Sequence, residues 1–454
     1  MTELKPYQRE GVRMIYGFRG RALLADEQGL GKTIQCLDWI RRCPARRPVV
    51  IVCPASVKYV WQSEAALHFN MRTEVLEGRA TKKSRLPGDI VILNYDILPS
   101  WLKVLKKAKP QILVFDECHL CKNAGAKRTR ALRKLAKVAA SVIGTSGTPL
   151  TNRPIELWTS LNAINPSIFP DRLAYAWRYC QPRLGYRGEW VFDGATNTKE
   201  LHRILRERVM IRRLKKDVLK ELPPISQRAV PFKLGTYEEY DNAQKNFILW
   251  LKKKNPTKAK RAARSEALTK VGYMLRLVAQ LKIDWTTKWI EEFFENHPEE
   301  KLVGLTAHRF VVDHLREKFK GRMLFIDGRI KGRARHDTVR AFQTNHRYRL
   351  LVGNWIAAGV GITLTASSNI AALDLPWDPA TLKQGRDRIH RIGQKKPCTF
   401  WFLLALKTIE EKLLKLLRKK DGILGEVLDG ADKNGDDVLN IFDELLDEMK
   451  RERV

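Results

Sequence analysis

Arg21-Ala-Leu-Leu-Ala-Asp-Glu-Gln-Gly-Leu-Gly-Lys-Thr33 is the stretch that decides the fold class of this sequence. Its first five residues are nearly all apolar, which is typical of a parallel strand buried on both faces. Similar runs follow, with helical patterns between them, at 49–53, 90–93 and 112–115, and again at 301–306, 323–326, 350–352 and 370–373. Strands that alternate with helices indicate a doubly wound α/β fold, so the sequence predicts two α/β lobes.

The residues after the first strand are typical of a phosphate-binding loop. Gly29 and Gly31 would let backbone N–H groups close around phosphates, and Lys32 would neutralise the terminal phosphates. Thr33 would place its hydroxyl on Mg²⁺. The usual first glycine of this pattern is replaced by Asp26, so the strict pattern fails at one residue. Gly-Lys-Thr at a strand-to-helix junction still predicts a nucleotide site.

A pair of carboxylates follows the fourth predicted strand. Asp116 at the strand tip could hold Mg²⁺, and Glu117 could orient or deprotonate an attacking water. Such carboxylates can also be purely structural, but together with Lys32 they predict an NTPase. A competing interpretation makes Cys118 and Cys121 half of a zinc site. No second Cys-x-x-Cys and no nearby His pair supplies the other ligands, which disfavours zinc.

The texture of the sequence divides it into four parts. Residues 1–165 are predicted to form the first lobe, which holds the nucleotide site, and residues 301–420 the second lobe. Residues 166–300 are predicted to hold helical insertions and a linker, with no strand of comparable quality from about 199 onward. Residues 421–454 form an acidic tail.

The charge balance is strongly basic. The chain carries 84 Lys and Arg against 50 Asp and Glu, a formal net charge of +34. The tail holds 11 acidic and 4 basic side chains, so the rest carries 80 basic against 39 acidic, a net of +41. Such an excess indicates a folded protein that neutralises nucleic-acid phosphates, because solubility alone seldom needs it.

Two charged segments leave alternatives open. The basic run 252–266 is either a solvated helix face or a contact along a nucleic-acid backbone, and nothing in the stretch decides between them. The tail segment Asp432-Lys-Asn-Gly-Asp-Asp437 superficially resembles a calcium loop, but Asp437 stands where the turn glycine is required. A solvated, autoinhibitory tail is the favoured interpretation.

Composition also bears on the compartment. The seven cysteines are odd in number and scattered, which favours reduced thiols. The first ten residues contain no apolar signal core, and no run approaches the ~18–20 apolar residues of a membrane span. We therefore expect a soluble monomer without a membrane partner, cytoplasmic in a prokaryote or a phage-infected cell and nuclear in a eukaryote.

Several motifs occur in order along the chain. They are Leu4-Lys-Pro-Tyr-Gln8, Asp26-Glu-Gln-Gly-Leu-Gly-Lys-Thr33, Asp116-Glu-Cys-His119, Ser146-Gly-Thr-Pro149, Gly359-Val-Gly-Ile-Thr-Leu-Thr365 and Gln384-Gly-Arg-Asp-Arg-Ile-His-Arg-Ile-Gly-Gln394. Together they resemble helicase superfamily two and, within it, the Swi/Snf-type DNA translocases. The run 211–223 looks like the linker between the two lobes of that family. The resemblance extends from Leu4 to about Asp429 and implies two RecA-like lobes.

Within that family the sequence looks most like the HARP-like annealing helicases, which rewind DNA and remodel forks. The residues that carry this likeness are Cys53-Pro-Ala-Ser-Val-Lys-Tyr-Val-Trp61, Trp177-Arg-Tyr-Cys180, Gly194-Ala-Thr-Asn197 and Val209-Met-Ile-Arg-Arg213. Compact branch-migration helicases of phages or bacteria are also similar. The two lobes leave no room for a separate fork-recognition domain, so we expect the core or a partner to recognise forks.

The resemblance implies roles for individual residues. Gln8 would read the adenine of ATP. Arg388 and Arg391 would reach the γ-phosphate from the second lobe as arginine fingers, with Gln384 beside them, so that hydrolysis depends on closure of the lobes. Coupling of hydrolysis to lobe movement is implied for Ser146, Gly147 and Thr148. Contacts with DNA sugar and phosphate are implied for Ser56, Lys58, His308, Thr363 and Thr365.

The sequence departs from the family pattern in places. Gly385-Arg386 stands where Ala-Glu is common, which adds a cation beside the finger loop, and Trp377-Asp378-Pro379 replaces Trp-Asn-Pro. Trp61 and Trp377 lie beside motifs, where a tryptophan is more often packing than function. Neither the Gly385-Arg386 change nor the Trp377-Asp378-Pro379 change is expected to abolish ATP hydrolysis.

The combined reading is an ATP- and Mg²⁺-dependent motor that steps along double-stranded DNA. Its expected outcome is branch migration, fork regression or strand reannealing, and its expected partners are branched DNA and replication or recombination proteins. Two alternatives remain open. One is a helicase that tracks RNA or single strands, and the other is a nucleotide-switched clamp that holds DNA without translocating.

Overall fold

In the computed structural model, the structure describes residues 3–415 and 417, apart from 81–84, 151–152, 186–187, 245–270, 331, 359–360 and 378. The described residues divide into two compact units, unit 1 up to Leu222 and unit 2 from Pro223 onward. The basic run 252–266, the tail 421–454 and its calcium-like loop lie outside the described residues.

Unit 1 is built on a parallel sheet. Among its described residues this sheet has seven strands in the order β3-β4-β2-β5-β6-β1-β9. The strands are β1 (Arg21–Leu24), β2 (Val49–Cys53), β3 (Glu74–Val75), β4 (Ile90–Asn94), β5 (Ile112–Asp116), β6 (Ser141–Thr145) and β9 (Met210–Ile211). All these strands pair in parallel, so their carboxyl ends, and the loops that follow them, meet at one edge of the sheet.

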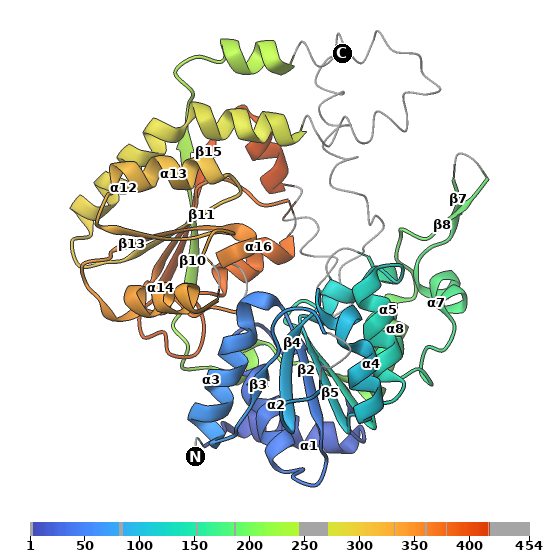
Figure 1. The fold of residues 1–454 in the computed structure, drawn as a ribbon. Coiled ribbons are helices and arrows are strands. Elements are labelled where there is room, and N and C mark those ends of the chain that lie inside the picture. The colour runs from blue at the N-terminus through green and yellow to red at the C-terminus, as the bar shows by residue number, and fades with distance from the viewer. Residues whose placement is uncertain are drawn as a thin grey trace. The chain divides into compact units, whose positions relative to one another are not determined.

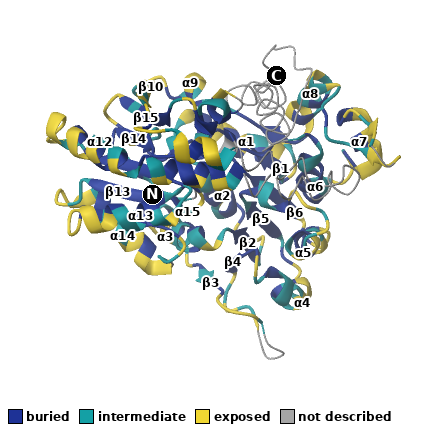
Figure 2. Ribbon diagram, turned by 90° about the horizontal axis from the view of Figure 1, so that it is seen from above, coloured by how far each residue is buried: buried dark blue, intermediate teal, exposed yellow. Residues whose placement is uncertain are grey.

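Helices cover both faces of this sheet, with α1, α2 and α3 on one face and α4, α5 and α6 on the other (Figure 1). The helices of unit 1 are α1 (Pro6–Gly17), α2 (Lys32–Arg41), α3 (Lys58–Phe69), α4 (Leu98–Ala108), α5 (Lys127–Ala136), α6 (Ile155–Ile164), α7 (Arg172–Tyr179), α8 (Thr198–Arg208) and α9 (Lys215–Val218). Short 3₁₀ turns lie at Ala55–Val57 and Cys118–Cys121. The central strands are fully buried between these layers, as their apolar composition requires (Figure 2).

A smaller antiparallel hairpin projects from unit 1 beside α7 (Figure 1). It pairs β7 (Arg183–Leu184) with β8 (Trp190–Val191).

Unit 2 repeats the parallel architecture. Its described residues form a six-stranded sheet in the order β10-β15-β14-β11-β13-β12. The strands are β10 (Ile225–Phe232), β11 (Leu302–Thr306), β12 (Met323–Ile326), β13 (Leu350–Asn354), β14 (Asn369–Ala372) and β15 (Cys398–Ala405). The helices are α12 (Ile283–Asn296), α13 (Arg309–Lys318), α14 (Gly332–Thr344), α15 (Trp355–Ala358) and α16 (Pro379–Arg386), and residues 271–281 and 409–415 are also helical.

The predicted fold class, two doubly wound α/β lobes with parallel sheets, is confirmed. All eight strands predicted from apolar runs are present to within about a residue at either end, except β13, which runs two residues further. One expectation was wrong, because strands β9 and β10 lie in the range expected to hold no strand. β10 lies at the edge of its sheet, so its outer positions are polar and it tolerates Pro231.

The boundary between the compact units falls at 222/223, inside the range expected to hold insertions and linker. Among the described residues, no helix is both long enough and apolar enough to cross a membrane.

Candidate active site

The glycine loop of unit 1 joins β1 to α2 through residues with left-handed backbone. Gly29 has φ 89° and Gly31 has φ 74°, conformations that side chains rarely adopt. A Cβ on Gly31 would also come within 2.4 Å of the Gln8 side-chain nitrogen. Gly31 precedes the first residue of α2, so the free N–H groups of that helix end face the loop. This loop can therefore close around an anion.

Lys32 is held over the loop by main-chain oxygens. Its Nζ donates to the carbonyls of Asp26 at 2.9 Å and Glu27 at 3.4 Å. Burial lowers the pKa of this ammonium, while Glu117, Asp26 and Asp116 act in the opposite direction. The lysine charge is thus oriented by neutral carbonyls and lies near carboxylates on neighbouring strand ends. Thr33 lies half-buried in the first turn of α2.

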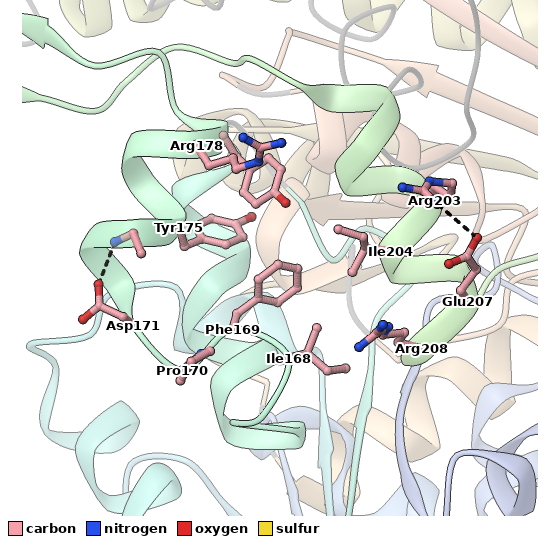
Figure 3. A pocket seen from close by; sticks show the side chains of 12 residues that line it. Ile168, Phe169, Pro170, Asp171, Tyr175, Arg178, Arg203, Ile204, Glu207 and Arg208 are labelled. Atoms are coloured by element: carbon pink, nitrogen blue, oxygen red, sulfur yellow. Dashed lines mark hydrogen bonds and ion pairs between the residues drawn. The ribbon is translucent and has the colours of Figure 1, made fainter.

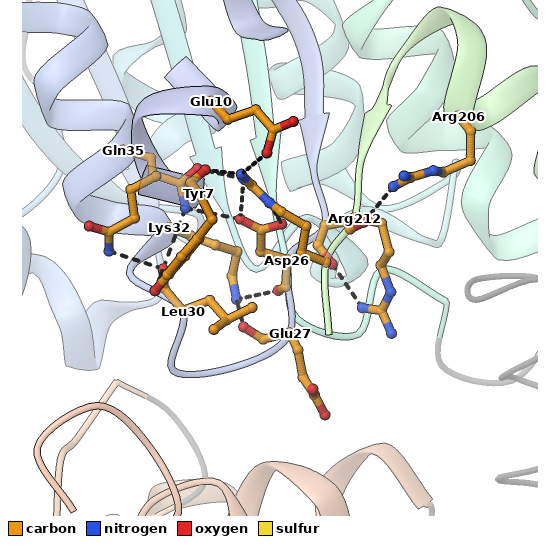
Figure 4. A network of polar contacts seen from close by, with 12 residues as sticks. Tyr7, Glu10, Asp26, Glu27, Leu30, Lys32, Gln35, Arg206 and Arg212 are labelled. Atoms are coloured by element: carbon orange, nitrogen blue, oxygen red, sulfur yellow. Dashed lines mark hydrogen bonds and ion pairs between the residues drawn. The ribbon is translucent and has the colours of Figure 1, made fainter. Parts of the chain in front are cut away.

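Asp26, which replaces the usual glycine, has a fully buried side chain with a dedicated cation. Arg213 donates to it through Nε at 3.0 Å and Nη2 at 2.7 Å, and Gln35 Nε2 donates at 2.9 Å. Arg213 also donates to the Tyr7 carbonyl and to Gln35 Oε1. Figure 4 shows these contacts converging on the loop. A carboxylate at this position is tolerated because it is neutralised in place.

The same segment holds the loop through a second arginine. Arg212 Nη1 donates to the Ala25 carbonyl at 2.8 Å and to the Gly147 carbonyl at 3.0 Å. The N–H of Lys215 donates to Glu27 Oε2 at 2.7 Å. Sequence reasoning assigned the run 211–223 to a linker and missed this role. The pairing of β9 with β1 brings Arg213, which follows β9, to the buried Asp26, and the sequence alone does not indicate this contact.

Gln8 lies against the same loop. Its Nε2 is 3.3 Å from the Leu30 carbonyl, and its Oε1 accepts from the Lys5 N–H at 2.9 Å. The neighbouring Tyr7 hydroxyl donates to the same Leu30 carbonyl at 3.2 Å. The structure therefore brings Gln8 to the glycine loop, while its role toward adenine stays a prediction.

Asp116 sits at the end of β5 with both carboxylate oxygens oriented by neighbours. Thr145 Oγ1 donates to Oδ1 at 2.6 Å, and the Trp61 indole N–H donates to Oδ2 at 3.0 Å. Burial and the adjacent Glu117 raise the pKa of this carboxyl. Trp61 is thus a packing residue that also orients the acid, a contact that spacing in the sequence could not show.

Glu117 adopts a left-handed backbone, φ 51°, which turns its side chain toward the Ser-Gly-Thr loop. Ser146 Oγ donates to Glu117 Oε2 at 3.2 Å, and Gln28 Nε2 donates to Oε1 at 3.4 Å. His119 Nδ1 lies 3.3 Å from the same Oε2 and 3.1 Å from Ser146 Oγ. The acid following β5 is therefore linked directly to the motif following β6.

Residues of the Ser146–Thr148 loop are buried beside the glycine loop. The Thr148 N–H donates to Ser146 Oγ at 3.1 Å. A Cβ on Gly147 would come within 2.7 Å of Gln28 Oε1 and 3.0 Å of the Gln28 backbone nitrogen. Gly147 is thus required for the close approach of the two loops, which ties the predicted coupling motif to the nucleotide loop.

The thiols of the competing zinc interpretation are both buried in the core of unit 1. Burial raises the pKa of Cys118, and it raises the pKa of Cys121 to about 12. Burial thus favours the neutral thiol over the thiolate that zinc binds. In the parts of the chain that the structure describes, no group of three or more potential metal-binding side chains gathers.

In unit 2 the predicted finger residues differ in exposure. Arg388 is buried, and it donates through Nε to the Gln384 carbonyl at 2.9 Å and through Nη1 to the Ile362 carbonyl at 3.2 Å. Arg391 is half-buried and donates to the same Ile362 carbonyl at 3.2 Å. Gln384 is buried at the end of α16. The structure thus gathers the two arginines around the loop that contains Thr363.

The departures in this region have local explanations. A Cβ on Gly385 would come within 2.6 Å of both Leu305 Cδ1 and Trp355 Cζ3, so only glycine fits there. The extra cation, Arg386, lies 3.6 Å from the Asp387 carboxylate. Trp377 is half-buried against the core of unit 2.

The predicted DNA-track residues have varied surroundings. Ser56 lies half-buried in the turn that follows β2. Lys58 is buried, and its Nζ pairs with Glu77 at 2.9 Å. In unit 2, His308 precedes α13 and stacks on Phe310, Thr363 is half-buried, and Thr365 accepts from Gln343 at 3.2 Å. The Lys58 ammonium is thus directed to a protein carboxylate, and the DNA contacts of all five residues stay predictions.

Comparison with known families is decisive once this geometry is in place. A family profile described as SNF2-related domain matches residues 7–286, and the helicase conserved C-terminal domain matches residues 285–393. The chain belongs to the SNF2-related family. The resemblance inferred from the motifs is therefore confirmed.

Individual relatives agree with this assignment. The chain is 34% identical over 442 residues to the SWI/SNF-related matrix-associated actin-dependent regulator of chromatin subfamily A-like protein 1 homolog of Caenorhabditis elegans, covering 94% of this chain and 62% of that protein. It is 30% identical over 447 residues to the DNA annealing helicase and endonuclease ZRANB3 of Homo sapiens, covering 94% of this chain and 41% of that protein. This SNF2-related chain thus spans roughly 40 to 60% of the length of these relatives.

Among solved structures, the chain is similar to the Sulfolobus solfataricus SWI2/SNF2 ATPase core in complex with dsDNA. The match has 23% sequence identity and a TM-score of 0.45, and it covers 95% of this chain and 94% of that one.

Proposed function

We propose that this SNF2-related chain is an ATP-dependent motor on double-stranded DNA that remodels branched DNA. The observation that carries the proposal is the network at one edge of the unit 1 sheet, where Lys32, Asp116 and Glu117 lie together and Glu117 bonds to Ser146. The name DNA annealing helicase, borne by one relative, supports rewinding or branch migration as the outcome.

The residues fit ATP with Mg²⁺. The left-handed glycines and the start of α2 suit an anion, and Lys32 supplies a positive charge that main-chain carbonyls orient. Asp116 is a half-buried residue whose carboxyl pKa is raised by desolvation and Glu117, so a divalent cation would relieve the crowding of negative charge there. Asp116 and Thr33 would hold the ion, which supplies charge stabilisation for the phosphates.

Glu117 is the proposed orienting residue for the attacking water. Its carboxylate is fixed by Gln28 and Ser146 and lies beside His119, so its direction is set before substrate arrives. A water that donates to this carboxylate would be aligned for attack. Because Ser146 belongs to the loop that also contacts Gln28 through Gly147, a change at Glu117 passes directly into that loop. We infer that this contact couples hydrolysis to movement.

The second unit completes the proposed mechanism. Arg388 and Arg391 would reach the γ-phosphate as arginine fingers, which are worth ~10³–10⁵ in rate in related chemistry. Gln384 lies beside Arg388 and would align it. The half-buried Arg391 needs less rearrangement than the buried Arg388 to leave the Ile362 carbonyl.

The net charge of +34 supports a nucleic-acid substrate. The name of the human relative, a DNA annealing helicase, favours DNA over RNA as that substrate. Ser56, Lys58, His308, Thr363 and Thr365 remain the proposed contacts with sugar and phosphate. We further propose that the motor acts as a monomer and meets replication or recombination proteins at branched DNA.

Steady-state ATPase rates test the proposal. We expect strong stimulation by duplex DNA and more by a four-way junction, with little from single strands or duplex RNA. Lys32→Ala should abolish turnover and leave DNA binding intact, because the phosphates lose their counter-charge while the basic surface remains. Lys134→Ala, which removes an exposed lysine of α5, is the matched control.

The other outcomes are equally informative. Stimulation by RNA or single strands alone would replace the proposal with a strand-tracking helicase. Binding of duplex without any stimulation would replace it with a nucleotide-switched clamp. Wild-type turnover by Lys32→Ala would show that the nucleotide site is assigned wrongly.

A further inference from the structure

Unit 1 exposes a compact group of large apolar side chains around the β7–β8 hairpin. Leu173 and Trp177 on α7 are 57% and 43% exposed, and Leu184 and Trp190 on the hairpin are 63% and 50% exposed. We call these four residues the tryptophan surface. Figure 2 shows exposed positions along this part of α7. Two half-exposed tryptophans side by side are costly in water and usually mark a binding surface.

The two indoles contact each other. Trp177 and Leu173 are four residues apart and share the outer side of α7, while Tyr175 and Tyr179 are buried on its inner side. Trp190 pairs with Leu184 across the hairpin. The rings of Trp177 and Trp190 have centroids 4.5 Å apart at 60°, so each indole leaves part of its face uncovered.

The base of the hairpin is rigidly built. The N–H groups of Gly194 and Thr196 donate to the carbonyls of Cys180 and Tyr179 at 3.2 and 3.1 Å. Asn197 Nδ2 donates to the Arg178 carbonyl at 2.8 Å. The segments 177–180 and 194–197, whose residues carry the likeness to annealing helicases, thus clasp each other. These hydrogen bonds connect the end of α7, which carries Trp177, to the base of the hairpin that carries Trp190.

Glycine is required in this clasp. A Cβ on Gly194 would come within 2.4 Å of Gln181 Oε1 and 2.5 Å of Gln181 Cβ. On the hairpin itself, Arg183 of β7 donates two hydrogen bonds to the Asp193 carboxylate, through Nε at 3.0 Å and through Nη2 at 2.7 Å. The hairpin is therefore fixed at its base and along its strands.

A basic hollow lies on the other side of α7. It is a cavity of about 450 Å³ between α7 and α8, with a floor formed by Phe169, Tyr175 and Tyr179. Figure 3 shows Arg178, Arg203 and Arg208 around it.

The acids that line this hollow are already engaged. Asp171 caps α7 by accepting from the Ala174 N–H at 2.6 Å, and Glu207 lies 3.9 Å from Arg203. Arg178 is bound by Glu200 at 2.9 and 2.5 Å, which fixes its guanidinium at the rim. Three arginines thus line the hollow against two acids, and two of those arginines are paired, Arg178 with Glu200 and Arg203 with Glu207.

We propose that the tryptophan surface stacks unpaired bases at a DNA branch, while the arginines around the neighbouring hollow hold the backbone phosphates. Aromatic faces beside cations are the general means of binding single strands without reading sequence. Three exposed arginines beside aromatic faces favour a nucleic acid over an apolar protein partner. This inference rests on the proposed function, because it assigns branch recognition to a DNA motor.

Equilibrium binding of the full chain to two DNAs tests the inference without requiring turnover. One is a fork with unpaired arms and the other is a blunt duplex of equal length. We expect Trp190→Ala to weaken fork binding about tenfold, as the loss of one base stack does, and to leave duplex binding unchanged. Trp190→Phe should retain the fork preference, because it keeps an aromatic face. Leu67→Ala, which truncates an exposed side chain of α3 in the same unit, is the matched control.

A fluorescent 2-aminopurine in the unpaired arm reports stacking directly. Wild-type chain should quench it, and Trp190→Ala should not. Equal fork binding by wild type and Trp190→Ala, or an equal loss on fork and duplex, would overturn the inference, the first pointing to a protein partner for this surface and the second to a general DNA contact. Trp190-dependent fork binding without DNA-stimulated ATPase would leave this inference standing and sink the proposed function instead.

Discussion

The two units of this chain share one architecture but surround their charged motif residues with different neighbours. In unit 1, Lys32 lies near Asp26, Asp116 and Glu117, and the acids are oriented by hydroxyl, indole and amide donors. In unit 2, Arg388 and Arg391 donate to a carbonyl of their own unit. The fold therefore does not assign the chemistry; the polar residues that follow its strands do.

Two buried ion pairs extend the comparison. Arg213 and Asp26 in unit 1 join the glycine loop to the end of the unit, 2.7 Å apart. Lys282 and Glu410 in unit 2 are 2.6 Å apart and almost fully buried. We infer that the first pair positions a functional loop and that the second holds a core together. Substitutions can separate these roles.

The largest effect is expected at the arginines of unit 2. Arg391→Ala should slow DNA-stimulated hydrolysis by ~10³–10⁵, the range for loss of an arginine finger, with little change in the unfolding midpoint. Arg388→Ala should slow hydrolysis and also lower the stability of the chain, because it removes buried hydrogen bonds to Gln384 and Ile362. Steady-state rates and thermal unfolding of both variants separate the cases. A wild-type rate for Arg391→Ala would transfer the finger role to Arg388 alone.

The next effect is expected in the core of unit 2. Lys282→Met should reduce the free energy of unfolding by about 3–5 kcal/mol, because it leaves the Glu410 carboxylate buried without its partner. Lys282 Nζ also donates to the Leu403 carbonyl at 2.7 Å. The double variant Lys282→Met with Glu410→Leu should recover most of the loss. Denaturant titration of the full chain measures both.

The pH dependence of that loss has a definite sign. Burial already raises the pKa of Glu410, and removing Lys282 takes away the main group that lowers it. A raised carboxyl pKa means that stability falls as pH rises through the folded value. The deficit of Lys282→Met should therefore be greatest at neutral pH and should shrink as the pH is lowered. A deficit that grows on acidification would contradict this account.

A smaller effect is expected at the glycine loop. Arg213→Ala should raise the KM for ATP several-fold and lower stability by about 1–3 kcal/mol, because Asp26 loses its charged donor. Adding Asp26→Asn should restore stability in part, since the uncompensated charge is then gone. Arg72→Ala, which removes an exposed ion pair elsewhere in unit 1, serves as the control for KM. An unchanged KM for Arg213→Ala would mean that the Arg213–Asp26 pair only stabilises the fold, as the Lys282–Glu410 pair does.

The sequence predicted the apolar, fully covered strands better than it predicted the strands that contain polar residues. Val49–Cys53 and Ile112–Asp116 are apolar because both faces of a parallel sheet are covered, and that requirement is visible in one dimension. Strand β6, Ser141–Thr145, went unpredicted because Ser, Gly and Thr break the apolar run. β10 went unpredicted because most of its positions are exposed and Ser226, Gln227 and Arg228 interrupt the apolar run, as an edge strand allows.

The site divides in the same manner. The motif residues Lys32, Asp116 and Glu117 were identified because their spacing reflects a local turn. Arg213 and Trp61 were not, because their contacts with Asp26 and Asp116 join positions 187 and 55 residues apart. Only the folded sheet brings such positions together, and a single sequence contains no signal of that distance.

The smallest effect is expected at Lys58, where the family resemblance and the structure point in different directions. The resemblance implies a contact with DNA phosphate, but the ammonium is paired with Glu77 and its side chain is 8% exposed. Each lost phosphate contact lowers the slope of log affinity against log salt by ~0.9 on duplex DNA. Because the ammonium is already committed to Glu77, we expect Lys58→Ala to change that slope by much less. Glu77→Ala should do the opposite, since it frees the cation and should strengthen binding at low salt. If Lys58→Ala lowered that slope by the full ~0.9, DNA would have to displace Glu77 from the lysine. Lys58 of unit 1 would then resemble Arg388 and Arg391 of unit 2, because each would be held by its own unit until a substrate binds it.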